Sequence, residues 1–453
     1  MTAAANNRFG LADSLNNGPY RRIWNLSWPT ILSNLTVPLL GAVDTAVMGH
    51  LPDAAYVGAV AVGAMIFSFV YWGFGFLRMG TVGFAAQAKG SRDTDEIRAV
   101  LARALLVGLA LAFVILALQT PIRWGALAII DGAPEVERLA GAYFDVRVWG
   151  APATLANYGV LGWLLGMQYV RTALVIQVVI NALNVALDLW FVLDLGWGVE
   201  GVALATAIAQ YAGAVLGLLL VFYHLKAIGG RWQRTRILDA AALRETFRVN
   251  RDIFLRTLAM IFAWSLLTWS GAKLGTTVLA ANAILMNFQS FLAHGLDGFA
   301  HATSALVGEA VGARDRRALR RCIAAATAMA TVVAVAYTLI YAITGPAIIR
   351  VFTDIGELRA FASPYLVWVI ASPLLSVWAY QLDGIFIGAT RSAEMRNAML
   401  VSVAVYVAAM AILPGLWGNH GLWLSVMIFM VVRALTLACL YPKIEMVIVE
   451  KSA

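Results

Sequence analysis

The segment Gln87-Ala-Lys-Gly-Ser-Arg-Asp93 decides how this chain is organised, because a similar segment, Glu309-Ala-Val-Gly-Ala-Arg-Asp315, follows 222 residues later. Two further pairs keep nearly the same spacing: Gly166-Met-Gln168 matches Gly388-Ala-Thr390, and Trp197 with Gly201 matches Trp417 with Gly421 at a shift of 220. Repetition at about half the chain length indicates two copies of one structural unit. The sequence therefore predicts a duplicated fold.

The composition places this duplicated fold in a membrane. Of the 453 residues, 61% are hydrophobic and only 13% are charged, whereas roughly a quarter of the residues in soluble domains are charged. A transmembrane helix needs about 20 apolar residues, so the chain has room for twelve spans joined by short loops. Large soluble domains are excluded because too little chain remains for them.

Apolar runs separated by turn residues or charges predict twelve helices and an all-α integral membrane fold. The predicted helices cover residues 23–48, 56–87, 97–118, 137–167, 172–193, 201–225, 248–272, 278–310, 318–343, 359–388, 397–414 and 421–441. Because six helices precede the repeat, both copies enter the membrane in the same orientation. We expect two six-helix bundles related by a pseudo-two-fold axis along the membrane normal, around a central cavity that opens alternately to each side.

This organisation predicts three parts of the chain. Residues 1–225 would form the N-lobe with helices 1–6, and residues 248–453 the C-lobe with helices 7–12. Residues 226–247 lie between them in a basic, mostly polar segment that we expect to be a cytoplasmic connector.

The distribution of lysine and arginine predicts the orientation. With the N-terminus inside, 25 of the 33 basic residues fall in cytoplasmic segments and six in external ones. This asymmetry follows the positive-inside rule and predicts a multi-pass protein of the bacterial inner membrane with both termini cytoplasmic. The net charge of +8 therefore reflects contact with the lipid bilayer, and we expect no nucleic-acid partner.

Polar side chains form a stripe on the fifth predicted helix. Gln177, Asn181 and Asn184 precede Asp188 by eleven, seven and four residues, which places all four on one helical face. Such a face must line a cavity or meet a partner helix, because ionisable groups at membrane depth are costly in lipid. Asp44, late in the first helix, is the second acid of the N-terminal half.

Neighbouring helices supply further polar groups, and the repeat shows that the cluster is not part of the scaffold. Tyr143 and Asn157 share a face of the fourth helix, and Thr206 lies on the sixth. In the second half, the positions of Asp44, Asn184, Asp188 and Thr206 hold Leu266, Tyr406, Met410 and Val426. This asymmetry favours an ion or proton site over structural hydrogen bonding. Two facing carboxylates would raise the proton affinity of one of them, or could hold a monovalent cation with nearby oxygens, and both alternatives stay open.

The second half carries weaker candidates. His294, Asp297 and Asp383 could contact substrate or a gate, or could make buried hydrogen bonds between helices. Arg78 and Arg433, inside predicted helices, are expected to pair with acids or reach an interface rather than bind substrate. We expect no metal site and no cofactor other than the coupling ion.

Two prolines, Pro29 and Pro38, interrupt the helix that carries Asp44. Proline removes a backbone hydrogen bond and permits a kink. The bend could respond to the charge state of Asp44 or could be static, and the sequence favours neither.

Missing motifs narrow the source of energy. No Gly-Lys dipeptide occurs, so the Walker A phosphate loop is absent, and no hydrolase motif is found at membrane depth. We therefore expect a transporter driven by an ion gradient rather than an enzyme.

Several segments resemble the MATE family of multidrug efflux transporters. The first helix contains Pro29-Thr-Ile-Leu-Ser-Asn-Leu-Thr-Val-Pro-Leu-Leu-Gly-Ala-Val-Asp-Thr-Ala-Val-Met-Gly-His50, which is similar to the family's opening helix. The segments that resemble its DinF branch are Leu296-Asp-Gly-Phe-Ala300, Gly308-Glu-Ala-Val-Gly-Ala-Arg-Asp315 and Leu382-Asp-Gly-Ile-Phe-Ile-Gly-Ala-Thr-Arg391. The resemblance implies two six-helix lobes around a V-shaped cavity, and antiport of cationic amphipathic compounds against protons or sodium.

The resemblance also implies the roles of individual residues. The DinF branch carries an N-lobe pocket whose members match Asp44, Tyr143, Asn184, Asp188 and Thr206. The NorM branch carries an acid on the seventh helix, where this chain is apolar through residues 261–267. Asp383 is not equated with the NorM acid on the tenth helix, because its spacing to the following arginine differs by about a turn.

We therefore expect a multidrug antiporter, functional as a monomer, that exports cationic or amphipathic small molecules. Asp44 and Asp188 would take up a proton or sodium ion, and the first helix would bend to close the N-lobe pocket. The nearest alternative is a lipid-linked oligosaccharide flippase of the same superfamily. It should have a strongly cationic central cavity, whereas only Arg78 and Arg433 lie at depth. A channel is a more distant alternative, and a membrane enzyme is the remotest.

Overall fold

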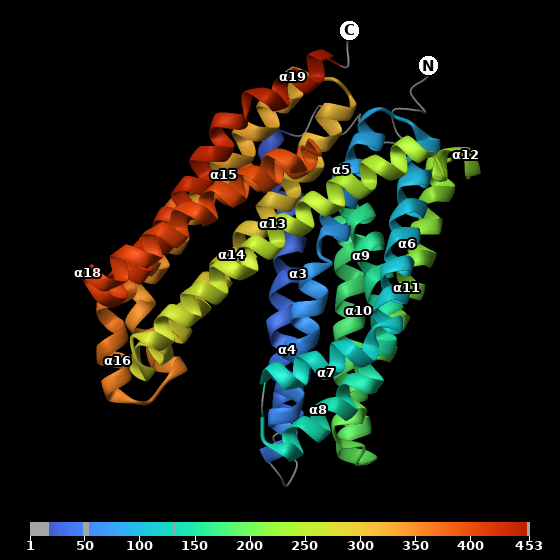
Figure 1. Ribbon diagram of the computed structural model, residues 1–453. Helices are drawn as coiled ribbons and strands as arrows, with labels where there is room; N and C mark the ends of the chain where they lie inside the picture. The colour runs from blue at the N-terminus through green and yellow to red at the C-terminus, as the bar shows by residue number, and fades with distance from the viewer. Residues whose placement is uncertain (1–17, 49–53, 131, 451–453) are drawn as a thin grey trace. The chain divides into compact units, whose positions relative to one another are not determined.

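The computed structural model describes residues 18–48, 54–130 and 132–450, and these ranges are almost entirely helical without any β-strand (Figure 1). In the first half the elements are α3 (Pro19–Met48), α4 (Ala54–Gly73), α5 (Phe76–Gly90), α6 (Thr94–Ala117), α7 (Gln119–Ile130), α8 (Pro134–Arg147), η1 (Val148–Gly150), α9 (Ala151–Gly166), α10 (Val170–Asp188), η2 (Leu189–Asp194) and α11 (Gly198–Ile228). The remaining elements are α12 (Arg234–Ile237), α13 (Ala240–Lys273), α14 (Thr276–Gly312), α15 (Arg316–Phe352), α16 (Gly356–Ala362), η3 (Ser363–Tyr365), α17 (Leu366–Gly388), α18 (Ser392–Leu440) and α19 (Pro442–Glu450).

Nine helical stretches of the described chain are long and apolar enough to cross a membrane. They coincide with ten of the twelve predicted segments, because the last stretch, Ser392–Met446, covers both 397–414 and 421–441. The other two predicted segments fall in α3 and in α8 with α9. The α18 helix kinks at Trp417 and Gly418, where Gly418 takes a φ of 55° that glycine adopts without steric cost. The prediction of an all-α membrane fold is confirmed, whereas the short helices α7, α12 and α19 were not predicted.

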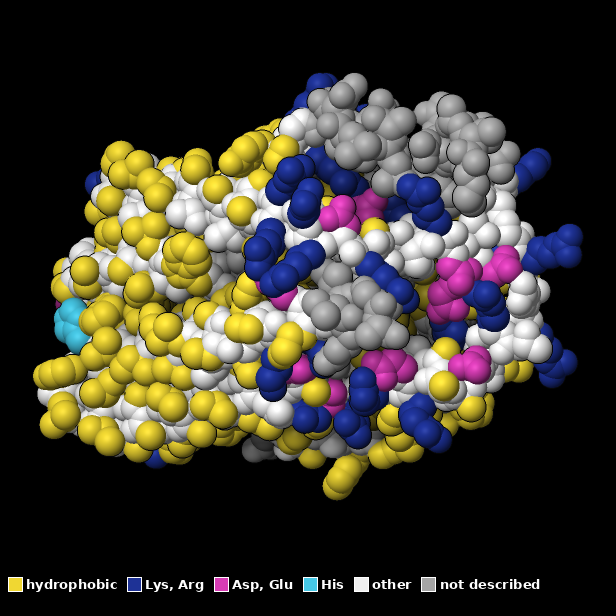
Figure 2. All heavy atoms as spheres, turned by 90° about the horizontal axis from the view of Figure 1, so that it is seen from above, with side chains coloured by type: hydrophobic (Ala, Val, Ile, Leu, Met, Phe, Trp, Pro, Cys, Tyr) yellow, Lys and Arg dark blue, Asp and Glu magenta, His cyan; other side chains and the backbone are white. Residues whose placement is uncertain are grey.

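Charged and apolar side chains separate on the surface of the protein. Seen from above, Lys and Arg side chains gather together with a smaller number of acids, and hydrophobic side chains cover wide areas beside them (Figure 2). Only helices and closed barrels satisfy all backbone polar groups within lipid, and the exposed apolar surface of these helices suits that environment.

The described chain divides into two compact units. The first unit contains Leu32–Phe247 and therefore includes the segment 226–247, while the second contains residues 248–450 together with residues 18–31. The boundary near the N-terminus falls inside α3. Within the second unit, Arg22 of α3 forms an ion pair with Glu309 of α14, and Gly298 of α14 gives room to the side chain of Ile31.

The repeated segments adopt the same backbone conformation in each unit. Arg92 and Arg314 have φ angles of 59° and 56°, although neither is glycine. The aspartates that follow, Asp93 and Asp315, cap the next helix by accepting backbone N–H groups at 3.0 and 2.9 Å, as N-cap residues do. The sequence repeat therefore encodes a helix end, a left-handed turn and a capped helix start, once in each unit.

Helix packing repeats as well. A Cβ atom at Gly162 of α9 would collide with the backbone of Arg78 on α5, and one at Gly384 of α17 would collide with the backbone of Ala300 on α14. These positions correspond at a shift of 222. Glycine at such positions lets two helix backbones approach closely, so both units depend on the same close contact.

Candidate functional site

The acid on α10 lies in a buried hydrogen-bonded group within the first unit. Asn184 and Asp188 are both 0% exposed, and Thr206 on α11 is also buried. With the Asn184 amide oriented to satisfy both neighbours, Nδ2 donates to Oδ2 of Asp188 at 3.2 Å, and the amide oxygen accepts the backbone N–H of Thr206 at 3.2 Å. The Thr206 hydroxyl lies 3.1 Å from the same amide oxygen and donates to the carbonyl of Val202 at 2.9 Å.

The helix changes form immediately after this acid. The α10 helix ends at Asp188, and the chain continues as a π-helix, η2. A π-turn widens the backbone and shifts the side chains that follow around the helix axis, and such turns are frequent at functional sites. Asp194 at the far end of η2 is exposed, so the two acids of this segment have opposite environments.

A second polar contact continues the group along α11. Gln210 lies one turn beyond Thr206, and Asn157 of α9 donates through Nδ2 to the Gln210 backbone carbonyl at 3.0 Å and to its side-chain oxygen at 2.9 Å. Asn157 is 2% exposed. Gln210 was not predicted as a site residue, although its spacing of four residues from Thr206 places both on one face of the helix.

Two further residues of the predicted stripe pair with each other. Nε2 of Gln177 donates to Oδ1 of Asn181 at 2.9 Å, and both side chains are partly buried. This bond lies within α10 at a spacing of four residues. It occupies the shared face without joining another helix.

Tyr143 occupies an aromatic part of the first unit. Its side chain is 3% exposed, its ring fills the space that Gly63 of α4 leaves, and its centroid lies 6.3 Å from that of Phe67. Arg147, one turn along α8, places its guanidinium 5.6 Å from the Phe67 ring centroid, a cation–π contact. The sequence predicts an external position for Arg147 and does not predict its contact with these rings.

The predictions that concern the first helix stay predictions. The backbone of α3 is helical from Pro19 to Met48 and includes Pro29, Pro38 and Asp44. The side chains of Pro38 and Asp44 lie outside the described part of the structure. Pro29 is buried in the second unit.

The second unit contains a buried cluster of opposite charges. Asp383 of α17 accepts from Arg256 of α13 and from Arg433 of α18 through the same oxygen, Oδ2. All three residues are buried, with exposed fractions of 6%, 6% and 1%. Buried charges are tolerated when they are paired in this way. Arg433 pairs with an acid as predicted. Arg256 was not predicted to take part, because in the sequence it closely follows the basic connector.

The other candidates of the second half lie around this cluster or apart from it. Asp297 of α14 interacts electrostatically with Arg256 and with Tyr380, so it belongs to the same charged region as Asp383. His294 lies on the same helix, and its Nδ1 is 2.6 Å from the carbonyl of Ser290 within that helix.

Comparisons with known proteins agree with this architecture. The family profile MatE matches residues 29–190 and 253–413, one stretch in each half. The chain is 42% identical over 423 residues to DNA damage-inducible protein F of Escherichia coli K12, covering 93% of this chain and 92% of that protein. It is 25% identical to human multidrug and toxin extrusion protein 1, covering 91% of this chain and 73% of that protein.

A solved structure described as MATE in the bent conformation matches the fold with a TM-score of 0.87, at 20% identity and over 100% of both chains. This likeness shows that the chain has the twelve-helix fold of that protein.

Proposed function

The chain belongs to the MatE family of membrane transporters, and from that premise we propose that it is an antiporter for cationic amphipathic compounds, driven by protons or sodium. Relatives with names that specify multidrug resistance and toxin extrusion support efflux of drugs or toxins. The finer statement, antiport coupled to an ion, rests on the buried group around Asp188.

One observation carries the proposal: a fully buried carboxylate whose amide neighbour also contacts a hydroxyl, present in only one half of a duplicated scaffold. A carboxylate at membrane depth is costly, and a scaffold that folds with Met410 at the equivalent position does not need one. Binding of a coupling ion would explain why the chain keeps the Asp188 carboxylate despite the free-energy cost of burying it.

The geometry suggests how Asp188 would work. When charged, its Oδ2 accepts from the Asn184 amide, and the oxygen of the same amide contacts Thr206 of α11. Uptake of a proton would remove the charge, and uptake of sodium would draw on the oxygens of the same residues. Either event would weaken the attraction of the first unit for a cationic substrate. We propose that Asp44 contributes the second carboxylate of this exchange.

The test is transport by Asp188→Asn in proteoliposomes loaded with a fluorescent amphipathic cation such as ethidium. Proton and sodium gradients are imposed separately. We expect wild-type export with one of the two gradients and export below about one-tenth of it for Asp188→Asn. The matched control is Asp194→Asn, which removes an exposed acid from the adjoining π-helix and should export normally.

Two results would contradict this proposal. Full gradient-driven export by Asp188→Asn would show that this carboxylate is not the coupling group. Equal flux in wild type with and without any ion gradient would indicate a passive channel.

The orientation and assembly state belong to the same proposal. The chain is a multi-pass membrane protein, and we propose that both termini are cytoplasmic and that a single copy is functional. Cysteine accessibility at each terminus in spheroplasts tests the orientation.

A further inference from the structure

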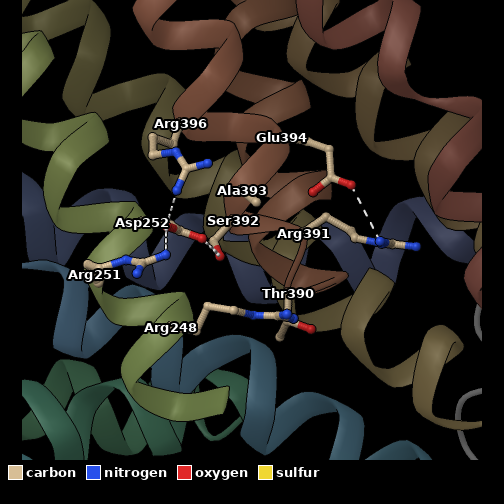
Figure 3. A pocket seen from close by; sticks show the side chains of 9 residues that line it. All are labelled: Arg248, Arg251, Asp252, Thr390, Arg391, Ser392, Ala393, Glu394 and Arg396. Atoms are coloured by element: carbon tan, nitrogen blue, oxygen red, sulfur yellow. Dashed lines mark hydrogen bonds and ion pairs between the residues drawn. The ribbon is translucent and has the colours of Figure 1, made fainter. Parts of the chain in front are cut away.

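A cavity of about 200 Å³ lies in the second unit. It is lined by residues of α13 between 248 and 252 and by residues 390–396 around the start of α18. Its lining consists of Arg248, Arg251, Asp252, Thr390, Arg391, Ser392, Ala393, Glu394 and Arg396 (Figure 3). None of these residues belongs to the buried cluster around Asp383. The cavity is lined mainly by charged side chains and therefore suits a charged ligand.

The charges of the lining favour an anion. Four arginines face two carboxylates, which leaves two positive charges in excess. Arg251 and Arg396 both converge on Asp252, at 3.1 and 2.6 Å, and Arg391 turns toward Glu394 at 3.4 Å (Figure 3). Asp252 is 1% exposed and also lies 3.3 Å from the Ser392 hydroxyl, so it holds the cationic groups in place.

The backbone adds to this positive potential. The α18 helix begins at Ser392, and its N-cap residue, Arg391, makes no side-chain capping bond. The first N–H groups of a helix have no partner within it, and the helix dipole makes this end partly positive. The first turn of α18 contributes Ser392, Ala393 and Glu394 to the cavity lining, so the partly positive end of the helix lies beside the guanidinium groups.

The surface next to the cavity is apolar. On α13, Leu255 and Leu258 are 39% and 42% exposed, and on α18, Leu400 and Val401 are 50% and 52% exposed. The same two helices therefore carry a charged cavity at one end and exposed hydrocarbon a turn or two further along. A molecule that combines an anionic head with acyl chains matches both features.

We propose that this cavity binds the phosphate headgroup of an anionic phospholipid. Arginine binds phosphate through paired N–H donors, and basic pockets between helices on the cytoplasmic side suit anionic headgroups. The cavity residues come from segments that the charge distribution assigns to the cytoplasm. The bound lipid holds α13 against α18 and stabilises the second unit.

The charged residues that line this cavity do not recur in the first half of the repeat. At a shift of 222, Arg248, Arg251, Arg391 and Arg396 correspond to Leu26, Pro29, Tyr169 and Leu174. Asp252 corresponds to Thr30. The scaffold folds without these charges in its first copy, so their presence in the second calls for a separate explanation, which an anionic ligand provides.

The test compares lipid binding by the full-length protein and two double variants, using native mass spectrometry and thermal unfolding in detergent. The pocket variant is R248Q/R391Q. The matched control, R244Q/R321Q, removes two exposed arginines that do not line the cavity, one from α13 and one from a predicted cytoplasmic segment. The probes are cardiolipin, phosphatidylglycerol, phosphatidylcholine and inorganic phosphate alone.

We expect the two anionic lipids to bind and to raise the unfolding temperature of the wild type and the control equally. The pocket variant should bind them about tenfold more weakly, with most of the temperature shift lost. Equal lipid binding by both variants would overturn the site. An equal shift with phosphatidylcholine would overturn its charge selectivity, and an equal shift with inorganic phosphate would overturn the lipid assignment in favour of a free-phosphate site. Mass spectrometry counts lipids on folded protein only, so a partly unfolded variant does not obscure the result.

Discussion

The two halves of this protein share a backbone plan but bury different polar groups. In the first unit, Asp188 is bonded by the neutral amide of Asn184, while in the second, Asp383 is shared by two arginines. At the equivalent positions the first cluster is replaced by Tyr406, Met410 and Val426, and the second by Asn34, Leu161 and Gly213. The duplicated fold therefore requires neither cluster. We propose that the first cluster exchanges a small cation and that the second holds three helices together through its charges.

Removing the acid of the first helix should have the largest effect on transport. It would test whether the coupling residues lie in the first half. We expect Asp44→Asn to remain in the membrane and to lose gradient-driven export, to below about one-tenth of wild type, because the exchange site would lose one of its two carboxylates. Efflux from proteoliposomes measures this, with a membrane-extraction assay as the check on folding. Full export by this variant would end the proposed role of Asp44.

Breaking the second cluster should affect stability rather than coupling. Asp383→Ala leaves Arg256 and Arg433 buried without their shared carboxylate, a change that costs about 3–5 kcal/mol. Thermal unfolding in detergent should therefore shift strongly. The triple variant Arg256→Met/Asp383→Leu/Arg433→Met should recover much of the lost stability. An Asp383→Ala protein as stable as wild type would show that the cluster does not hold the helices together.

Close packing should be equally sensitive in both halves, because the contact is repeated. A valine at Gly162 or at Gly384 would collide with the backbone of the facing helix, and overpacking of this kind costs about 1–3 kcal/mol. The two variants should lower the unfolding temperature by similar amounts. A large effect in one half only would show that the two copies of the scaffold have diverged in packing as well as in polar groups.

The smallest change replaces one residue of the first cluster by its equivalent in the second half. Thr206→Val imports the residue found at Val426 and removes the hydroxyl near the Asn184 amide. A lost hydrogen bond of this kind is worth about 1 kcal/mol, so we expect transport to fall several-fold without being abolished. The dependence of transport on proton or sodium concentration measures it, and an unchanged dependence would exclude Thr206 from the site.

Helical periodicity and the internal repeat predict only part of the candidate site. Asn184, Asp188 and Thr206 were predicted as one cluster from their helical spacing and from their absence in the second half. The structure places the three residues in contact. Arg256 could not be separated from the basic connector, because its burial depends on tertiary contact with α17. The π-helix after Asp188 follows no simple residue pattern, so the sequence did not indicate it.

The boundary inside α3 has a counterpart in α13. Residues 18–31 belong with the second unit, and residues 240–247 at the start of α13, which correspond to residues 18–25 at a shift of 222, belong with the first. In each copy, the beginning of the first helix therefore groups with the other unit. Domain swapping between identical chains produces the same arrangement. Either half expressed alone would lack a helical segment that groups with its unit, so we expect each isolated half to be less stable than the same half in the full chain.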